Sequence, residues 1–138
     1  MPKAITTDLA RSAVMRAVKS KDTTPEMIVR KAAHVLGFRY RLHRRDLPGN
    51  PDLVFPIRRK VIFVNGCFWH GHDCARGSRE PKTNVDYWRA KIARNVARDR
   101  CNLKALADTG WRVLTVWECE TKKAEKELLK RKLQDFLR

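Results

Sequence analysis

The segment 60–74 brings together two cysteines, two histidines and an aspartate, side chains of the types that bind metals or transfer protons. An apolar run ends at a glycine and is followed by Cys67, Phe68, Trp69, His70, Gly71, His72, Asp73 and Cys74. Thiolates and imidazoles are the usual ligands of zinc, and an imidazole outside the metal can act as a general acid or base near neutral pH. The segment therefore predicts metal binding, proton transfer and aromatic contacts in one short stretch.

Hydrophobic periodicity predicts the elements that must position this segment. We expect a helix that is capped at Thr23 and ends at Gly37, strands at 38–43, 52–55, 61–64 and 111–117, and helices at 85–108 and 122–138. These elements predict one α/β domain over 1–138, with a mixed sheet flanked by helices. Residues 1–21 are polar and basic, and we expect either an arm that lies on DNA or a frayed surface helix.

The strand at 61–64, the long helix and the strand at 111–117 predict a βαβ crossover with two parallel strands. Cys67 follows the first strand and Cys119 follows the second, so the crossover brings them to one edge of the sheet. With His72 and Cys74 they form a Cys3His set, which is typical of a closed, structural zinc site. The alternative is a group of small buried thiols beside a surface histidine, and Cys101 is read as a spare thiol.

A short connection predicts that the strands at 52–55 and 61–64 form an antiparallel hairpin. Folding the hairpin about residues 57–59 puts Asp52 opposite Val64 or Asn65, at the same edge as the metal-binding segment. A carboxylate beside a backbone carbonyl of the next strand suits Mg²⁺, with water and substrate phosphate completing the coordination. A strand-start aspartate is more often a turn former or a surface charge.

His70 and Glu26 are the remaining candidates for proton transfer. If His72 binds zinc, His70 is free to act as a general acid or base. Glu26 lies in the first turn of the first helix, where a carboxylate complements the helix dipole, and this capping role alone explains it. The functional alternative is that Glu26 supports a metal-bound water.

The charge of the chain predicts a polyanionic partner. Thirty-one lysines and arginines against fifteen aspartates and glutamates give a formal net charge of +16. The basic residues are spread along the chain rather than confined to a tail, which favours a folded nucleic-acid binder over a basic arm. Ribosome association and binding to acidic lipids are the alternatives. The sequence contains no apolar run of membrane-spanning length and no signal peptide, so we expect a cytoplasmic protein with reduced thiols.

Phe68 and Trp69 lie between Gly66 and Gly71, in the segment that we expect a metal to fix. Two large aromatic side chains on such a loop can stack between bases and partially unstack a duplex. The alternative is that one of them packs beneath the loop as an ordinary apolar contact.

Several longer motifs resemble the very-short-patch-repair (Vsr) mismatch endonucleases. They are Asn50-Pro51-Asp52, Gly66-Cys67-Phe68-Trp69-His70 with His72 and Cys74, Tyr87-Trp88-Arg89-Ala90-Lys91-Ile92 with Asn95-Val96 and Arg98-Asp99-Arg100, and Gly110-Trp111-Arg112-Val113 through Trp117-Glu118-Cys119. The resemblance covers nearly the whole chain from Met15-Arg16-Ala17 onward. It implies a restriction-endonuclease-like fold and nicking 5′ to the T of a T:G mismatch, the product of 5-methylcytosine deamination, which starts excision repair.

The resemblance also implies a role for each matching residue. Magnesium is implied at Asp52 and the carbonyl of Val64, catalysis at His70 with Glu26 and Asp22, and zinc at Cys67, His72, Cys74 and Cys119. DNA contacts are implied for Met15, Phe68, Trp69, Trp88, Lys91 and Asn95. The implied substrate is double-stranded DNA with a T:G mismatch, bound by a monomer that hands the nick to repair proteins.

The chain departs from two patterns at Phe63-Val64-Asn65. The (D/E)-x-K half of the nuclease superfamily motif is absent, as it is in the Vsr family, whose members can carry threonine and histidine at the positions of Val64 and Asn65. Asn65 can hydrogen-bond a phosphate but cannot transfer protons near neutral pH. Two other readings stay open: a zinc-stabilised module that binds DNA without cutting it, and a related nuclease with restriction-type activity.

Overall fold

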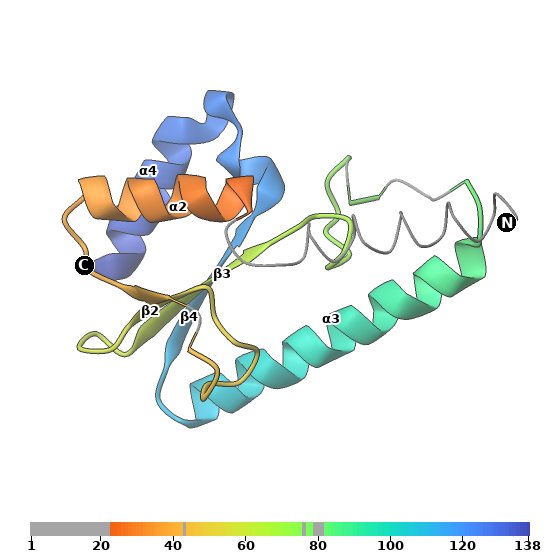
Figure 1. Cartoon of the computed structure of the whole chain (residues 1–138), viewed down its shortest axis with the longest axis horizontal. Helices are drawn as coiled ribbons and strands as arrows, with labels where there is room; N and C mark the ends of the chain where they lie inside the picture. The colour runs from red at the N-terminus through yellow and green to blue at the C-terminus, as the bar shows by residue number, and fades with distance from the viewer. Residues whose placement is uncertain (1–22, 43, 76, 79–81) are drawn as a thin grey trace, which may run out of the picture.

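The computed structural model describes residues 23–42, 44–75, 77–78 and 82–138 (Figure 1). The residues expected to form the basic arm, 1–21, lie outside this range, as do Asp22 and Met15, so their predicted roles have no structural counterpart here. Among the described residues, no helix combines the length and apolar character that crossing a membrane requires.

Within the described residues, four strands form one mixed sheet in the order β1-β2-β3-β4. The strands are β1 (Arg41–Leu42), β2 (Leu53–Phe55), β3 (Lys60–Asn65) and β4 (Arg112–Trp117). β2 is antiparallel to both β1 and β3, whereas β3 and β4 are parallel. The predicted hairpin and the predicted parallel pair are therefore both confirmed.

Helices cover both faces of the sheet, as predicted (Figure 1). They are α2 (Thr24–Val35), α3 (Val85–Asp108) and α4 (Lys126–Leu137), with short 3-10 turns η1 (Glu118–Thr121) and η2 (Lys123–Glu125) leading into α4. Figure 1 shows α2 and α4 together on one side of the sheet, whereas α3 runs along the other side and continues past the ends of the strands. The loop between β3 and α3 projects in the same direction as this free part of α3.

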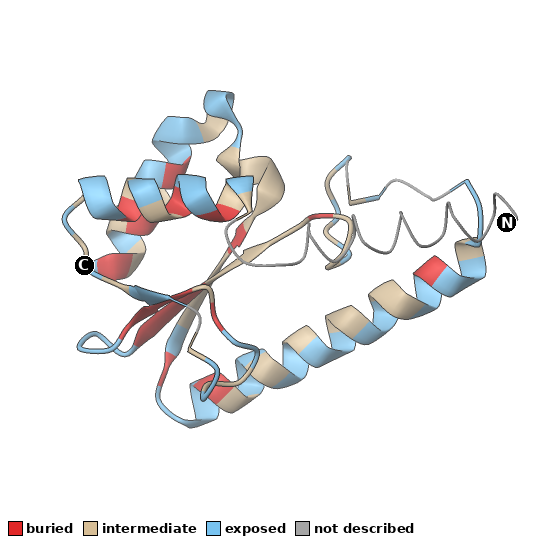
Figure 2. Cartoon of the chain, viewed as in Figure 1, coloured by how far each residue is buried: buried red, intermediate tan, exposed pale blue. Residues whose placement is uncertain are grey.

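Two apolar clusters hold these layers together (Figure 2). The larger joins α2 and α4 to the sheet and includes Val29, Phe55, Ile62, Leu129, Leu133 and Leu137. The smaller lies on the α3 side and includes Val54, Val61, Leu106 and Trp111. β2 is buried along its whole length because it contributes to both clusters, which agrees with its unbroken apolar sequence.

The first helix begins as its sequence predicts. Thr23 is the N-cap, and its hydroxyl accepts a hydrogen bond from the backbone N–H of Glu26. The helix ends before Gly37, whose φ of 89° is one that glycine adopts readily. Capping thus positions Glu26 in the first turn, where its side chain is buried.

Several details of the sequence prediction were wrong. Of the strand expected at 38–43, the described residues 38–42 are paired only at Arg41–Leu42, because the N–H of Phe38 bonds to the carbonyl of Ala33 and closes α2 instead. In the last helix, the helical spacing predicts an apolar face formed by Leu128, Leu129, Leu133 and Phe136. Leu128 is exposed instead, and the buried face of α4 is formed by Leu129, Leu133 and Leu137.

The predicted burial of α3 was also too extensive. The helical spacing of apolar residues predicts a buried face formed by Val85, Trp88, Ile92, Val96, Leu103 and Leu106. Of these six residues only Trp88 and Leu106 are buried, near opposite ends of the helix. Leu103 is exposed. The middle of α3 is less covered because the helix extends past the sheet, so the protein offers a long helical face to a partner (Figure 2).

The register of the hairpin differs from the prediction by one or two residues. Leu53 pairs with Ile62, which puts Asp52 opposite Phe63 rather than opposite Val64 or Asn65. The N–H of Asp52 donates to the carbonyl of Ile62 at 3.1 Å. Asp52 nevertheless reaches the expected edge of the sheet, because its side chain extends along β3 to the next backbone amide.

Candidate active site and metal centre

The parallel pair β3 and β4 delivers four metal-ligating side chains to one edge of the sheet. The ligand atoms of Cys67, His72, Cys74 and Cys119 all lie within 4.8 Å of one another. Tetrahedral zinc–thiolate coordination requires ligand atoms about 3.8 Å apart. Sγ of Cys119 and Nδ1 of His72 are 3.7 Å apart, so this pair already meets that requirement. The Cys3His group predicted from the sequence is confirmed as a set that can hold a metal ion.

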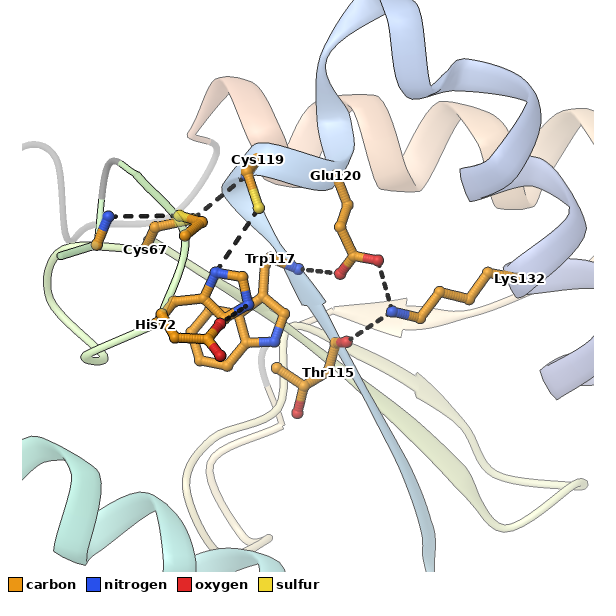
Figure 3. A network of polar contacts seen from close by, with 10 residues as sticks. Cys67, His72, Thr115, Trp117, Cys119, Glu120 and Lys132 are labelled. Carbon is orange, nitrogen blue, oxygen red and sulfur yellow. Dashed lines mark hydrogen bonds and ion pairs between the residues drawn. The ribbon is translucent and has the colours of Figure 1, made fainter.

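The surroundings of His72 fix the ring in a ligating orientation (Figure 3). Its imidazole stacks on the indole of Trp117, with ring centroids 4.2 Å apart and an interplanar angle of 17°. Nδ1 faces Cys119, while Nε2 lies 3.7 Å from a carboxylate oxygen of Asp73. A carboxylate at the second ring nitrogen is a common way to orient a metal-binding histidine.

Backbone amides already point at the sulfur atoms of this group. The N–H of Cys119 donates to Sγ of Cys67, and the N–H of Gly77 donates to Sγ of Cys74, both at 3.3 Å. Burial raises the pKa of Cys67 and that of Cys119 above the ordinary thiol value. A bound divalent metal would deprotonate these thiols, and the amides would stabilise the resulting thiolates.

The loop that carries these ligands is compact and rests on α3. The N–H of His72 donates to the carbonyl of Cys67 at 2.9 Å, and the N–H of His70 donates to the carbonyl of Gly66 at 3.2 Å. Gly71 has a φ of 64°, and a Cβ there would lie 2.9 Å from a methyl carbon of Val96 on α3. Glycine at this position therefore permits both the turn and the close approach.

A pocket of about 330 Å³ lies beside the metal-ligating group. Its lining comes from α2, from the ends of β3 and β4, from the loop and from α3. The lining residues are Thr23, Pro25, Glu26, Asp52, Val64, Gly66, Phe68, Trp69, His70, Asn95, Arg98, Asp99 and Glu118. Asp52, His70 and Glu26, which were separate candidates in the sequence, thus share one pocket.

Asp52 is held against β3 in a poorly solvated position. Its Oδ2 accepts a hydrogen bond from the N–H of Val64 at 2.7 Å. Burial, with a smaller contribution from the nearby carboxylate of Glu26, raises the pKa of Asp52 to about 7, although the Val64 amide and Arg30 act in the opposite direction. A carboxyl with such a pKa beside a second acid is a typical environment for a hard divalent cation.

The side chain of Glu26 is held in place by a contact within α2. It is only 3% exposed, and its carboxylate forms an ion pair with Arg30 one turn along the helix. This pair balances one of the negative charges next to Asp52. Because Glu26 faces the pocket, its position suits the role of supporting a metal-bound water.

His70 faces the pocket with its orientation set by α3. Its Nδ1 lies 2.5 Å from Oδ2 of Asp99. A carboxylate bonded to Nδ1 fixes the proton on that nitrogen and leaves Nε2 able to accept one. Sequence reasoning did not assign a role to Asp99. The signal for it was its position on α3, eleven residues after Trp88 and four after Asn95, on the same face of the helix.

The aromatic residues predicted to enter DNA form one cluster at the rim of the pocket. The rings of Phe68, Trp69 and Trp88 pack edge to face, with centroids 5.1 to 6.2 Å apart. The ammonium of Lys91 lies 6.0 Å from the Trp69 ring and 5.8 Å from the Trp88 ring. The side-chain amide of Asn95 donates to the carbonyl of Trp69 at 3.0 Å. All five predicted contact residues on the loop and α3 are therefore brought together.

Glu118 and Asn65 also lie near the site. Glu118 lines the pocket just before the ligand Cys119, and its carboxylate accepts a 3.4 Å hydrogen bond from the N–H of Cys67. Asn65 does not line this pocket. It lines a neighbouring hollow of about 390 Å³ that shares His70 and Asp99. Asn65 therefore shares a hollow with His70 and Asp99 but lies outside the pocket that Asp52 lines.

Comparisons with known proteins agree with this geometry. A family model described as DNA mismatch endonuclease Vsr matches residues 4–76. A type II nicking enzyme of Xanthomonas oryzae pv. oryzae, V.XorIIP, is 56% identical over 110 residues, which cover 80% of each chain. A type II nicking enzyme of Neisseria meningitidis, V.NmeAIP, is 45% identical over 86% of this chain and 84% of the relative. The DNA mismatch endonuclease Vsr of Escherichia coli K12 is 40% identical over 92% of this chain and 83% of the relative.

The chain is a DNA endonuclease, as its α/β fold, its acidic pocket with a histidine and these relatives together indicate. More narrowly, the chain belongs to the Vsr family of DNA mismatch endonucleases.

Proposed function

We propose that this endonuclease makes a magnesium-dependent nick 5′ to the T of T:G mismatches, and that the nick starts very-short-patch repair of deaminated 5-methylcytosine. The observation that carries the proposal is the convergence of Asp52, Glu26 and His70 on one pocket whose rim holds the aromatic cluster. In this arrangement, residues suited to phosphodiester hydrolysis lie next to aromatic rings that can separate stacked bases.

Asp52 and the main-chain carbonyl of Val64 are the proposed magnesium ligands. When bound, Mg²⁺ polarises the scissile phosphate and lowers the pKa of the attacking water. The burial of Asp52 excludes competing water, and its hydrogen bond to the Val64 amide fixes the orientation of its carboxylate. Glu26 holds a water at the pocket by hydrogen bonding, and Asp22, outside the described residues, is proposed to assist it.

His70 is the proposed general base or acid. Asp99 holds the ring through Nδ1, so Nε2 is the atom that accepts a proton from the attacking water. Asp99 is a positioning residue in this scheme. Asn65 is not required for proton transfer, since an amide does not titrate in the physiological range.

Phe68, Trp69 and Trp88 are the proposed wedge that enters the duplex beside the mismatch. Their mutual packing keeps the rings together at the rim before DNA binds. Lys91 and Asn95 are proposed to contact the mispaired bases, and Met15, outside the described residues, to press in from the other groove. Zinc in the Cys3His group would fix the wedge loop and leave no coordination position for water, so its role is structural.

The net charge of +16 supports steered, salt-sensitive association with double-stranded DNA. We further propose that the protein acts as a cytoplasmic monomer and hands the nicked duplex to repair proteins.

A nicking assay on duplexes that differ only in T:G or C:G at one position tests the proposal. We expect cleavage of one strand 5′ to the T that requires Mg²⁺, prefers T:G and is lost in Asp52→Ala. Binding without cleavage in any divalent metal would show a DNA-binding module, and equal double-strand cutting of matched DNA would show a restriction-type nuclease. Elemental analysis of the folded protein for zinc tests the second metal.

A further inference from the structure

Among the described residues that line the pocket, acidic side chains outnumber basic ones. Four carboxylates line it, those of Glu26, Asp52, Asp99 and Glu118. A DNA phosphate is itself an anion, so its entry is opposed by these groups even where a divalent cation offsets two of them. A protein cation aimed at the phosphate would remove much of that opposition.

Among the described residues that line the pocket, Arg98 is the one with a permanent positive charge. Arg30 compensates Glu26 from α2 but is not part of the lining. The superfamily lysine of the (D/E)-x-K pattern is absent, since Asn65 stands at its place in the sequence. Asn65 lines the neighbouring hollow and not this pocket, so Arg98 supplies the permanent positive charge among the described lining residues.

The position of Arg98 on α3 connects it to the rest of the site. It directly precedes Asp99, the partner of His70. Its Nη2 donates to Oδ1 of Asn95 at 3.1 Å, and Nδ2 of the same amide donates to the carbonyl of Trp69 at 3.0 Å. Asn95 thus holds the guanidinium with one end and the wedge loop with the other.

We propose that Arg98 is a catalytic residue that binds the scissile phosphate, and that Asn95 ties its position to the seating of the wedge. The proposal rests on the function assigned to this pocket above. A guanidinium presents several N–H groups in a planar fork, so one can remain on Asn95 while others donate to non-bridging phosphate oxygens. Donors aimed at the charge that develops on those oxygens lower the barrier to hydrolysis.

Arg98 transfers no proton in this step. Water forms the new P–O bond and gives its proton to Nε2 of His70, the bond to the leaving sugar oxygen breaks and that oxygen takes a proton from solvent, and the guanidinium stays protonated throughout. Its contribution is electrostatic. Because Asn95 links the two, we expect Arg98 to be displaced from the phosphate when the wedge residues do not enter the duplex, as on matched DNA.

The first test compares Arg98→Ala with Arg94→Ala in single-turnover nicking of a T:G duplex at saturating protein. Arg94 is a matched control because it lies one helical turn earlier on α3, is exposed and does not line the pocket. We expect Arg98→Ala to lower the rate by about 10²-fold, as loss of one oxyanion donor does. We expect Arg94→Ala to weaken DNA binding slightly, by less than about 3-fold, through its charge alone. Arg98→Lys should recover part of the rate because it restores charge without the fork.

The second test does not depend on cleavage. Affinities are measured without Mg²⁺ for T:G duplexes that carry either the normal phosphate or an uncharged methylphosphonate at the nick position. Replacing the charged phosphate should change the affinities of the parent protein and of Arg94→Ala by the same factor. For Arg98→Ala the corresponding factor should differ from this value by about 10-fold, because only this variant lacks the phosphate contact.

Equal rates for the two alanine variants at saturation, or equal methylphosphonate effects in all three proteins, would overturn the assignment. A parent protein that shows the methylphosphonate difference but nicks no duplex would instead contradict the proposed nuclease function and leave the phosphate contact standing. Circular dichroism and zinc content of Arg98→Ala identify a folding defect, in which case Arg98→Lys and Arg98→Gln carry the same two comparisons.

Discussion

The surroundings of His72 and of His70, which lie on the same loop, differ in how completely the protein itself provides partners for the polar atoms. Around His72, three thiols and an imidazole converge within 4.8 Å, and backbone amides and a stacked indole close the remaining sides. Around His70, by contrast, a carboxylate fixes one ring nitrogen while the other side of the ring faces an open pocket. The first region can enclose a metal ion, and in the proposed function the second leaves one side open for the substrate.

This difference shows that residue type alone does not assign a histidine. His70 and His72 stand two residues apart, and the glycine between them turns the backbone so that they face different neighbours. His72 faces β4 and its cysteine, whereas His70 faces α3 and its aspartate. The predictions below test the contrast, beginning with the largest effect.

Cys119→Ser should remove one ligand from the closed region and so disturb both regions. We expect loss of zinc, a fall in the free energy of unfolding of more than about 3 kcal/mol, and nicking at background level, because the wedge loop loses its anchor. Urea denaturation, zinc analysis and the nicking assay measure these. Cys101→Ser is the matched control, since Cys101 is an exposed free thiol outside the group. Equal behaviour of the two serine variants would refute a metal-fixed loop.

Asp99→Asn should damage the open region alone. We expect the nicking rate to fall about 10²-fold with unchanged DNA affinity and zinc content, because the amide no longer holds the His70 ring in the required tautomer. The double variant with His70→Ala should be no slower than His70→Ala by itself, since Asp99 acts through the histidine. Additive losses in the double variant would show that Asp99 has a separate role.

Asp52→Asn should stabilise the magnesium-free protein while abolishing nicking. The folded pKa of Asp52 is raised to about 7, whereas an aspartate in the unfolded chain has a pKa of about 3.9. Between these values the folded state holds a proton that the unfolded state has released, so rising pH removes stability from the parent but not from the variant. We expect an advantage for Asp52→Asn on the order of 4 kcal/mol at pH 8, since the two pKa values differ by about 3 and each pKa unit corresponds to about 1.4 kcal/mol.

This advantage should shrink as the pH falls through 7 and vanish near pH 4. Urea denaturation in magnesium-free buffer without chelator, so that zinc is retained, measures it. A constant difference across this range would mean that Asp52 is not held in a charge-destabilising site. Asp108→Asn, an exposed residue at the end of α3, should show no pH-dependent difference.

Gly71→Ala should give the smallest loss of stability, and it changes the glycine that separates His70 from His72. An alanine there combines a φ of 64° with a 2.9 Å contact to Val96, so we expect a loss of about 1–2 kcal/mol in the free energy of unfolding. Adding Val96→Ala should recover the part due to the contact and leave the part due to φ. No recovery would place the strain entirely in the backbone.

Much of the closed region was predictable from the sequence, and less of the open one. The spacing of the β3–α3–β4 unit was enough to bring Cys119 to Cys67, because parallel strands end at one edge. The pairing of His70 with Asp99 was not predicted, because it depends on how the loop rests on α3 and not on any local pattern.

Other differences have similar causes. The hairpin register was wrong because turn residues alone do not count the strand positions, and the first strand was too long because the backbone of Phe38 closes α2. The burial of Asp52 and the compensating charge of Arg30 required the packed structure. Local capping of Glu26 was predictable, whereas the group it faces was not.

Zinc content and nicking of His70→Ala and His72→Ala, measured side by side, test the central contrast most directly. We predict that His70→Ala keeps full zinc and full affinity for T:G duplex but does not nick, and that His72→Ala loses zinc and stability. Loss of zinc from His70→Ala with retention in His72→Ala would contradict the account, because it would exchange the two regions.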